Sequence, residues 1–171
     1  MDLTIKKALE LAVKIQNEGD LQKAEQIYRI ILKKNPKNSN ALHLLGLINY
    51  QKNNFEGAVK LISEAIKIDS KIPVYYGNLA MSYEALGKEE ESAKNFEKAL
   101  EINPKYGNAH LANYNLGIYY ENKGNLKKAL KYYNFAIGLD KNFYDARWNK
   151  GLILLSLGKF KEGWEEYKYR F

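Results

Sequence analysis

Cysteine is absent from this 171-residue sequence, which also has only two histidines and three prolines. Without cysteine there is no disulfide, no thiolate metal site and no cysteine nucleophile. The two histidines, His43 and His110, lie far apart in the chain, so they cannot form the helical pair of a zinc site. With three prolines and 12 glycines, the sequence has few of the turn-forming residues that a fold of many short strands needs.

Long apolar runs and catalytic motifs are also missing. No window approaches 18 uninterrupted apolar residues, and the N-terminus lacks the apolar core and cleavage site of a signal peptide. We therefore expect no membrane span and a cytoplasmic location. The sequence has no Gly-x-Ser-x-Gly, no phosphate-binding glycine loop and no His-Glu-x-x-His. We expect a non-enzymatic protein without a metal or a cofactor.

Charge is present but is not concentrated. Lysine and arginine exceed aspartate and glutamate by 27 to 20, which gives a net charge of +7 without a block of one sign. A nucleic-acid-binding protein usually gathers such an excess on one face, so no nucleic acid is expected as a partner. A hydrophobic content of 46% indicates a folded chain. The abundance of lysine and asparagine hints at a bacterial genome rich in A and T.

The chain is internally repetitive. Turn residues recur at spacings of 34, 34, 37 and 34: Gly19, Asn53, Gly87, Gly124 and Gly158. Seven positions before each turn stands a small residue: Ala12, Gly46, Ala80, Gly117 and Gly151. Another small residue follows each turn by five positions: Ala24, Ala58, Ser92, Ala129 and Gly163. A large residue follows by nine: Tyr28, Ile62, Phe96, Tyr133 and Tyr167.

This pattern resembles the tetratricopeptide repeat, a helix-turn-helix unit of 34 residues. Between the turns, apolar residues recur at the three- and four-residue spacing of helices. Small residues let two antiparallel helices approach closely, and large residues fill the space opposite them. One hairpin cannot bury its own apolar face, so the units must stack. We expect an all-α, right-handed α-solenoid in one domain, 1–171, with repeats 5–38, 39–72, 73–106, 110–143 and 144–171.

Three extra residues interrupt the repeat between Tyr106 and His110. Three helical residues add nearly one full turn, so the expected result is a lengthened first helix in the fourth unit. A longer loop is the alternative.

A ligand is expected in the concave groove lined by the first helix of each unit. Tyrosine, tryptophan and methionine, which are frequent interface anchors, occur among its inward-facing positions. The alternative role for these side chains is packing between neighbouring helices, and for His43 and His110 a neutral surface or packing role is the more usual one. The candidate peptide-binding residues are His43, Leu47, Tyr50, Asn78, Met81, Tyr114, Asn115, Ile118, Trp148, Asn149 and Leu152.

An asparagine row, formed by Asn78, Asn115 and Asn149, resembles the ladder of the O-linked N-acetylglucosamine transferase superhelix. There such amides hold the backbone of an extended polypeptide, because an amide both donates and accepts hydrogen bonds. The first two units depart from the row with Glu10 and Leu44. The lysine and asparagine residues of chaperone-tail clamps are likewise replaced by apolar residues and histidine, which argues against that use.

The C-terminal segment resembles the last repeat of bacterial proteins that continue into a glycosyltransferase domain. Gly163-Trp164 and the closing Tyr167-to-Phe171 stretch carry this likeness. No polar capping helix follows, so an apolar end made of Trp164, Tyr167 and Phe171 is expected to be exposed. A fragment of a longer protein, end-to-end self-association and a covering partner each explain such an end.

The resemblance implies a non-catalytic scaffold that binds a polypeptide segment in its groove; the partner's identity stays open. Two alternatives remain, the substrate-presenting arm of a larger bacterial glycosyltransferase and a self-assembling structural protein.

Overall fold

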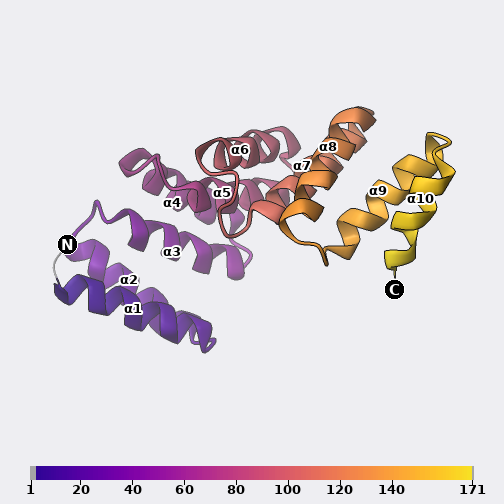
Figure 1. Ribbon diagram of the computed structural model, residues 1–171. Coiled ribbons are helices and arrows are strands. Elements are labelled where there is room, and N and C mark those ends of the chain that lie inside the picture. The colour runs from indigo at the N-terminus through magenta and orange to yellow at the C-terminus, as the bar shows by residue number, and fades with distance from the viewer. Residues whose placement is uncertain (1–2, 171) are drawn as a thin grey trace. The chain divides into compact units, whose positions relative to one another are not determined.

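A computed structural model describes residues 3–170, and every regular element in that range is helical (Figure 1). This confirms the all-α expectation. A short 3-10 turn, Lys168–Arg170, follows the last of the α-helices. The helices are α1 (Leu3–Asn17), α2 (Leu21–Lys34), α3 (Ser39–Gln51), α4 (Phe55–Ile68), α5 (Pro73–Ala85), α6 (Glu89–Ile102), α7 (Ala109–Asn122), α8 (Leu126–Leu139), α9 (Tyr144–Ser156) and α10 (Phe160–Tyr167).

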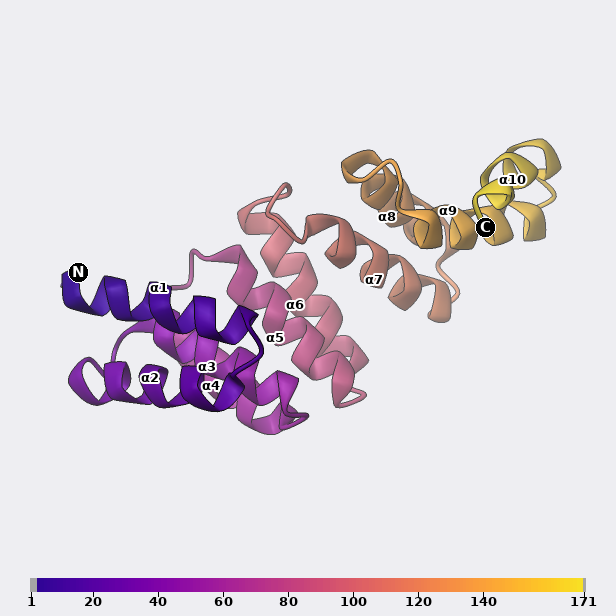
Figure 2. The same ribbon diagram turned by 90° about the horizontal axis from the view of Figure 1, so that it is seen from below.

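The helices form consecutive hairpins of a solenoid, and the chain divides into two compact units. Unit 1 extends to Ser92 and unit 2 begins at Ala93, so the boundary falls inside α6. In unit 1, α2 contacts α1 and α3, and α4 contacts α3 and α5. In unit 2, α8 contacts α7 and α9, and α9 contacts α10. Figure 2 shows the two helices of each of these hairpins side by side.

The turn between the two helices of each hairpin requires a left-handed residue, as the sequence predicts. Gly19, Gly87, Gly124 and Gly158 all have a positive φ, and so does Asn53, with φ 59°. Asparagine is one of the few side chains that adopt this conformation readily. Asparagine or aspartate then caps several of the second helices. For example, Asn54 Oδ1 accepts a hydrogen bond from the Gly57 amide, and Asp20 Oδ1 accepts one from the Lys23 amide.

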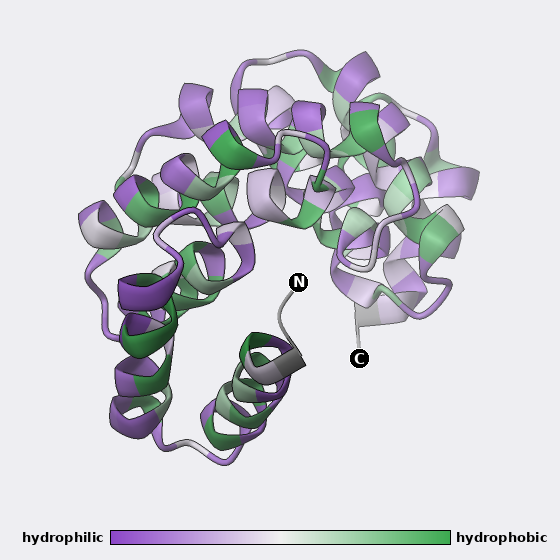
Figure 3. Ribbon diagram, turned by 90° about the vertical axis from the view of Figure 1, so that its left-hand side faces the viewer, coloured by the Kyte–Doolittle hydropathy of each residue, from purple (hydrophilic) through white to green (hydrophobic). Residues whose placement is uncertain are grey.

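Small residues bring the two helices of a hairpin together, again as the sequence predicts. A Cβ added to Gly46 would lie 2.6 Å from Ile62, and one added to Gly117 would lie 2.4 Å from the Tyr133 ring. Ile62 and Tyr133 are fully buried in the apolar clusters of unit 1 and unit 2, respectively. Figure 3 shows how hydrophobic residues recur among hydrophilic ones along the helices. Hydrophobic residues form the buried clusters of both units, although some large apolar side chains stay exposed.

The insertion enters mainly the loop, so the expected helix lengthening is largely wrong. The α6–α7 loop covers residues 103–108, whereas the α4–α5 loop covers only 69–72. Helix α7 has 14 residues against 13 in α3, α5 and α9, so it gains a single residue. Loop hydrogen bonds from the Tyr106 amide to Asn103 and from the Ala109 amide to Tyr106 end one helix and begin the next. The Tyr106 side chain, which belongs to this loop, is buried, and its burial favours the turn.

Two alanine substitutions in one hairpin test this close packing. Gly117→Ala would place a methyl group in steric conflict with the buried Tyr133 ring, so we expect a loss of about 1–3 kcal/mol in the free energy of unfolding. Gly138→Ala is the matched control in α8. Its Cβ would meet open space, so the loss of backbone freedom in the unfolded chain should stabilise the protein by up to about 1 kcal/mol. Urea denaturation followed by circular dichroism measures both. Equal effects of the two substitutions would contradict the close approach of α7 and α8.

Candidate functional site

The predicted ligand-binding residues of unit 1 lie on α3 and α5, but they are not equally accessible. His43 is only 6% exposed, so its ring belongs to the interior. This is the packing role that the sequence left open for it. Leu47, Tyr50, Asn78 and Met81 are half-buried. The Tyr50 ring packs edge-on against Phe55, with 5.4 Å between ring centroids.

His43 joins α3 to α5 through a buried polar contact. Its Nε2 lies 2.8 Å from Asn78 Nδ2, and its ring lies 4.5 Å from the Tyr75 ring. An amide nitrogen only donates, so Nε2 accepts and carries no proton in this arrangement. Burial lowers the pKa of His43 to about 4. The side chain is therefore neutral at physiological pH and positions Asn78 rather than a ligand.

A hollow lies between the first helices α1 and α3 of unit 1. Its volume is about 390 Å³, and Leu9, Val13 and Leu44 supply its apolar lining. Lys6, Glu10 and Asn40 supply the polar part. The helical spacing predicts Leu9 and Val13 on the inward face, but gives no reason to single out Lys6 or Asn40. Asn40 Oδ1 also accepts a hydrogen bond from Tyr75 Oη at 2.6 Å, a contact that joins α3 to α5.

The predicted residues of unit 2 lie on α7 and α9. Tyr114, Asn115, Ile118, Trp148 and Asn149 are half-buried, and Leu152 is 40% exposed. Rings also pack within this set of helices. The Tyr114 ring lies 4.9 Å from Phe143, and the Trp148 ring lies 4.5 Å from Tyr167. These aromatic side chains thus combine the packing role with partial exposure.

Polar contacts between successive first helices recur at a sequence separation of 35. In unit 1 they join His43 to Asn78, and Tyr75 to Asn40. In unit 2, Asn149 Nδ2 donates to Tyr114 Oη at 3.4 Å. The separation is one repeat plus one residue, which places the two side chains on adjacent first helices. The repeat length in the sequence predicts which positions face one another on adjacent first helices. It does not predict which of these pairs form hydrogen bonds.

The expected apolar C-terminal end is partly present. Trp164 is 54% exposed, Tyr167 is half-buried, and Phe171 lies outside the described residues. Tyr167 packs between Trp148 and Trp164, with the Trp164 ring 5.2 Å away.

Ion pairs fix α10 against α9. The Glu166 carboxylate pairs with Arg147 and Lys150, both at 2.8 Å. Burial alone would raise the pKa of Glu166, but hydrogen bonds from Lys150 and Arg147 outweigh it and lower the pKa.

Residues 3–170 contain no cluster of three or more histidine, aspartate or glutamate side chains arranged to hold a metal ion. No helix in that range is long and apolar enough to cross a membrane.

Known proteins share the repeated helical hairpins of this chain. Models of the family described as "Tetratricopeptide repeat" match residues 16–71 and 72–142. Human "Tetratricopeptide repeat protein 6" is 28% identical over 136 residues, which are 80% of this chain and 25% of the human protein. The chain thus spans a quarter of that relative's length.

Two solved structures show the fold. YrrB, described as "a TPR protein with an unusual peptide-binding site", superposes with a TM-score of 0.77 at 17% identity, covering 95% of this chain and 82% of YrrB. An O-GlcNAc transferase mutant from Thermobaculum terrenum superposes with a TM-score of 0.67 at 30% identity. That match covers 77% of this chain and 26% of the transferase.

Proposed function

Because the chain belongs to the tetratricopeptide repeat family, we propose that it is a non-catalytic scaffold whose first helices bind an extended polypeptide segment. The observation that carries the proposal is the hollow between α1 and α3, whose lining combines leucine and valine with Lys6, Glu10 and Asn40. An apolar surface with a few polar groups is the usual form of a binding site. The description of YrrB as having a peptide-binding site supports the same kind of ligand.

The asparagine row indicates which atoms would bind the peptide backbone. The donor end of the Asn78 amide points to His43, and the donor end of Asn149 points to Tyr114 and Tyr133. The carbonyl oxygens of Asn78 and Asn149 are then the groups that accept hydrogen bonds from peptide N–H groups. Such contacts recognise a backbone whatever its side chains, while aromatic edges such as Trp148 select the side chains.

Trp148→Ala tests the contribution of the α9 surface. A peptide first has to be selected from a random display library on the full chain. If Trp148 is an anchor, its removal should raise the Kd of that peptide about tenfold or more, because buried tryptophans often dominate binding energy. Trp164→Ala in α10 is the control and should leave the Kd unchanged. Isothermal titration calorimetry measures both, with circular dichroism to verify folding. An unchanged Kd in a folded Trp148→Ala variant removes Trp148 from the proposed site.

Two alternatives have specific support. Similarity to the Thermobaculum transferase favours a substrate-presenting arm of a larger glycosyltransferase. The exposed rings of Phe160 and Trp164 favour end-to-end self-association. Sedimentation velocity over a concentration range separates self-association from peptide binding, because only the former increases the mass of the chain without a ligand.

A further inference from the structure

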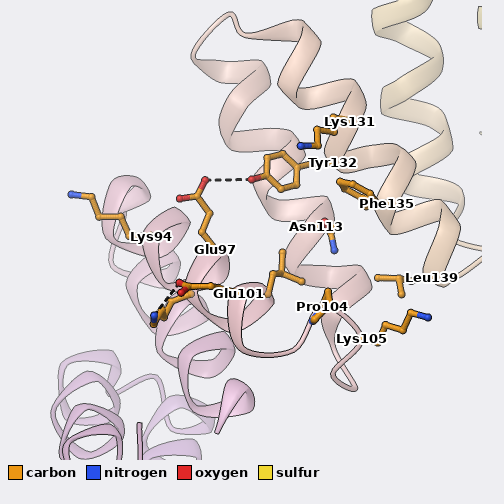
Figure 4. A pocket seen from close by; sticks show the side chains of 12 residues that line it. Lys94, Glu97, Glu101, Pro104, Lys105, Asn113, Lys131, Tyr132, Phe135 and Leu139 are labelled. Atoms are coloured by element: carbon orange, nitrogen blue, oxygen red, sulfur yellow. Dashed lines mark hydrogen bonds and ion pairs between the residues drawn. The ribbon is translucent and has the colours of Figure 1, made fainter. Parts of the chain in front are cut away.

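A hollow of about 680 Å³ lies between α6 and α8, on the second helices of unit 2 (Figure 4). All its lining residues belong to unit 2, and none is a residue of the proposed peptide-binding site. Its apolar wall includes Leu100 from α6, and Phe135 and Leu139 from α8. Phe135 is 51% exposed and Leu139 is 41% exposed, so water covers apolar surface that a ligand can bury.

The lining residues follow one face of each helix. On α6 they include Lys94, Glu97 and Glu101, at helical spacings of three and four. On α8 they include Lys131 and Phe135, also one turn apart. The hollow is thus a trough between two helices. Its α6 wall, from Lys94 to Glu101, covers about two helical turns, which suits a third helix of similar length. A trough with an apolar wall is the form that binds an amphipathic helix.

The charge around the trough is positive. Lys94, Lys98, Lys105 and Lys131 line it against two carboxylates, Glu97 and Glu101. Residues 123–139, which include α8, contain four lysines and no aspartate or glutamate.

Both carboxylates are already engaged within the unit. The Glu101 carboxylate pairs with Lys98 at 2.9 Å. The Glu97 carboxylate accepts hydrogen bonds from Tyr120 Oη at 2.8 Å and from Tyr132 Oη at 3.3 Å, the second of which is drawn in Figure 4. Burial, together with Glu97, raises the pKa of Tyr132 to about 12, so this donor keeps its proton. A ligand therefore meets an excess of ammonium groups around the apolar wall.

We propose that the trough between α6 and α8 is a second docking site, specific for an acidic amphipathic helix. Its apolar side chains would contact Leu100, Phe135 and Leu139, and its flanking carboxylates would pair with Lys105 and Lys131. The site is separate from the first-helix surface, so the chain can hold two polypeptide segments at once.

The test uses the full chain and two synthetic helices. Both carry leucine or phenylalanine at i, i+3, i+4 and i+7; one has glutamate at the remaining positions, and the other has lysine. Fluorescence anisotropy should show saturable binding of the acidic helix at least about tenfold tighter than that of the basic helix. Phe135→Asp, an exposed position, should weaken binding about tenfold or more. Lys131→Glu should weaken it and reduce its salt dependence.

Lys127→Glu, on α8 but outside the trough, is the matched charge control and should change the Kd less than Lys131→Glu does. Trp148→Ala should leave binding of the acidic helix unchanged, which separates this site from the proposed first-helix site. Four results would overturn the proposal: no binding of the acidic helix, equal binding of the basic helix, an unchanged Kd in folded Phe135→Asp, or an equal loss in Trp148→Ala. The fatty acid laurate serves as a small-ligand probe. If laurate binds and the acidic helix does not, the proposed docking site is replaced by a pocket for a small ligand. A mass that rises with concentration in the wild type and not in Phe135→Asp would replace it with self-association.

Discussion

Tyr133→Ala should destabilise unit 2 by about 3–5 kcal/mol, the usual cost of removing a large buried aromatic ring. Tyr133 has no exposed surface and packs against the backbone of Gly117. A glycine at position 117 brings the helices together around the ring, so neighbouring side chains have little freedom to fill the cavity. Urea denaturation followed by far-UV circular dichroism measures the loss.

Two further variants separate the causes of this loss. Tyr133→Phe keeps the ring but removes the hydroxyl that donates to Glu121 Oε2 at 2.6 Å, and it should cost about 1–2 kcal/mol. Phe135→Ala lies two residues away on the same helix and is half-exposed, so it should cost less than about 1 kcal/mol. A Tyr133→Ala loss no larger than the Phe135→Ala loss would contradict the buried position of Tyr133. Because repeats are coupled mainly to their neighbours, the loss is expected to appear as an earlier transition of part of the chain.

Protonation of His43 should by itself lower the free energy of unfolding of unit 1 by about 3 kcal/mol as the pH falls. In the folded chain the pKa of His43 is lowered to about 4 from an ordinary value of 6.5, because burial penalises the charged ring. The unfolded chain therefore binds the proton first, so the stability due to the neutral ring is complete above pH 6.5 and decreases as the pH falls from 6.5 to 4. Each pKa unit corresponds to about 1.4 kcal/mol. Urea denaturation at a series of pH values measures the slope.

His43→Leu provides the control for this pH dependence. It should show a flatter dependence of the free energy of unfolding between pH 6.5 and 4.5, whatever its absolute stability. The acidic groups with lowered pKa values, such as Glu25 and Glu166, lose their contribution only below their ordinary value of 4.5. A wild-type slope retained in the variant would show that another group titrates in this interval. It would also contradict the buried contact between His43 and Asn78.

The two proposed sites use the repeat in different ways. The first-helix surface depends on features that recur in most units, such as the aromatic residues and the asparagine row. The trough between α6 and α8 depends on features of one place in the chain, namely the exposed Phe135 and the lysines around it. A partner that binds both proposed sites would contain an extended segment of any sequence and an acidic helix.

The sequence by itself determined the helical hairpins. The spacing of Gly19, Asn53, Gly87, Gly124 and Gly158 predicted five turns, and all five residues have the left-handed backbone that such turns need. Pairs such as Gly117 and Tyr133 predicted where two helices approach. These features could be read because they depend on backbone conformation and side-chain volume within one repeat, which local sequence specifies.

Only the tertiary structure decided which side chains are accessible and which are paired. His43 and Trp148 occupy equivalent positions of their repeats, yet one ring is buried against Asn78 and the other is half-exposed. The three inserted residues went mainly into the α6–α7 loop, although the local sequence favoured a lengthened first helix. The trough between α6 and α8 could likewise not be predicted from the sequence, because residues about 35 positions apart line it together. Such outcomes depend on packing between neighbouring helices, where burial, charge and hydrogen bonds from distant segments act on the same side chain.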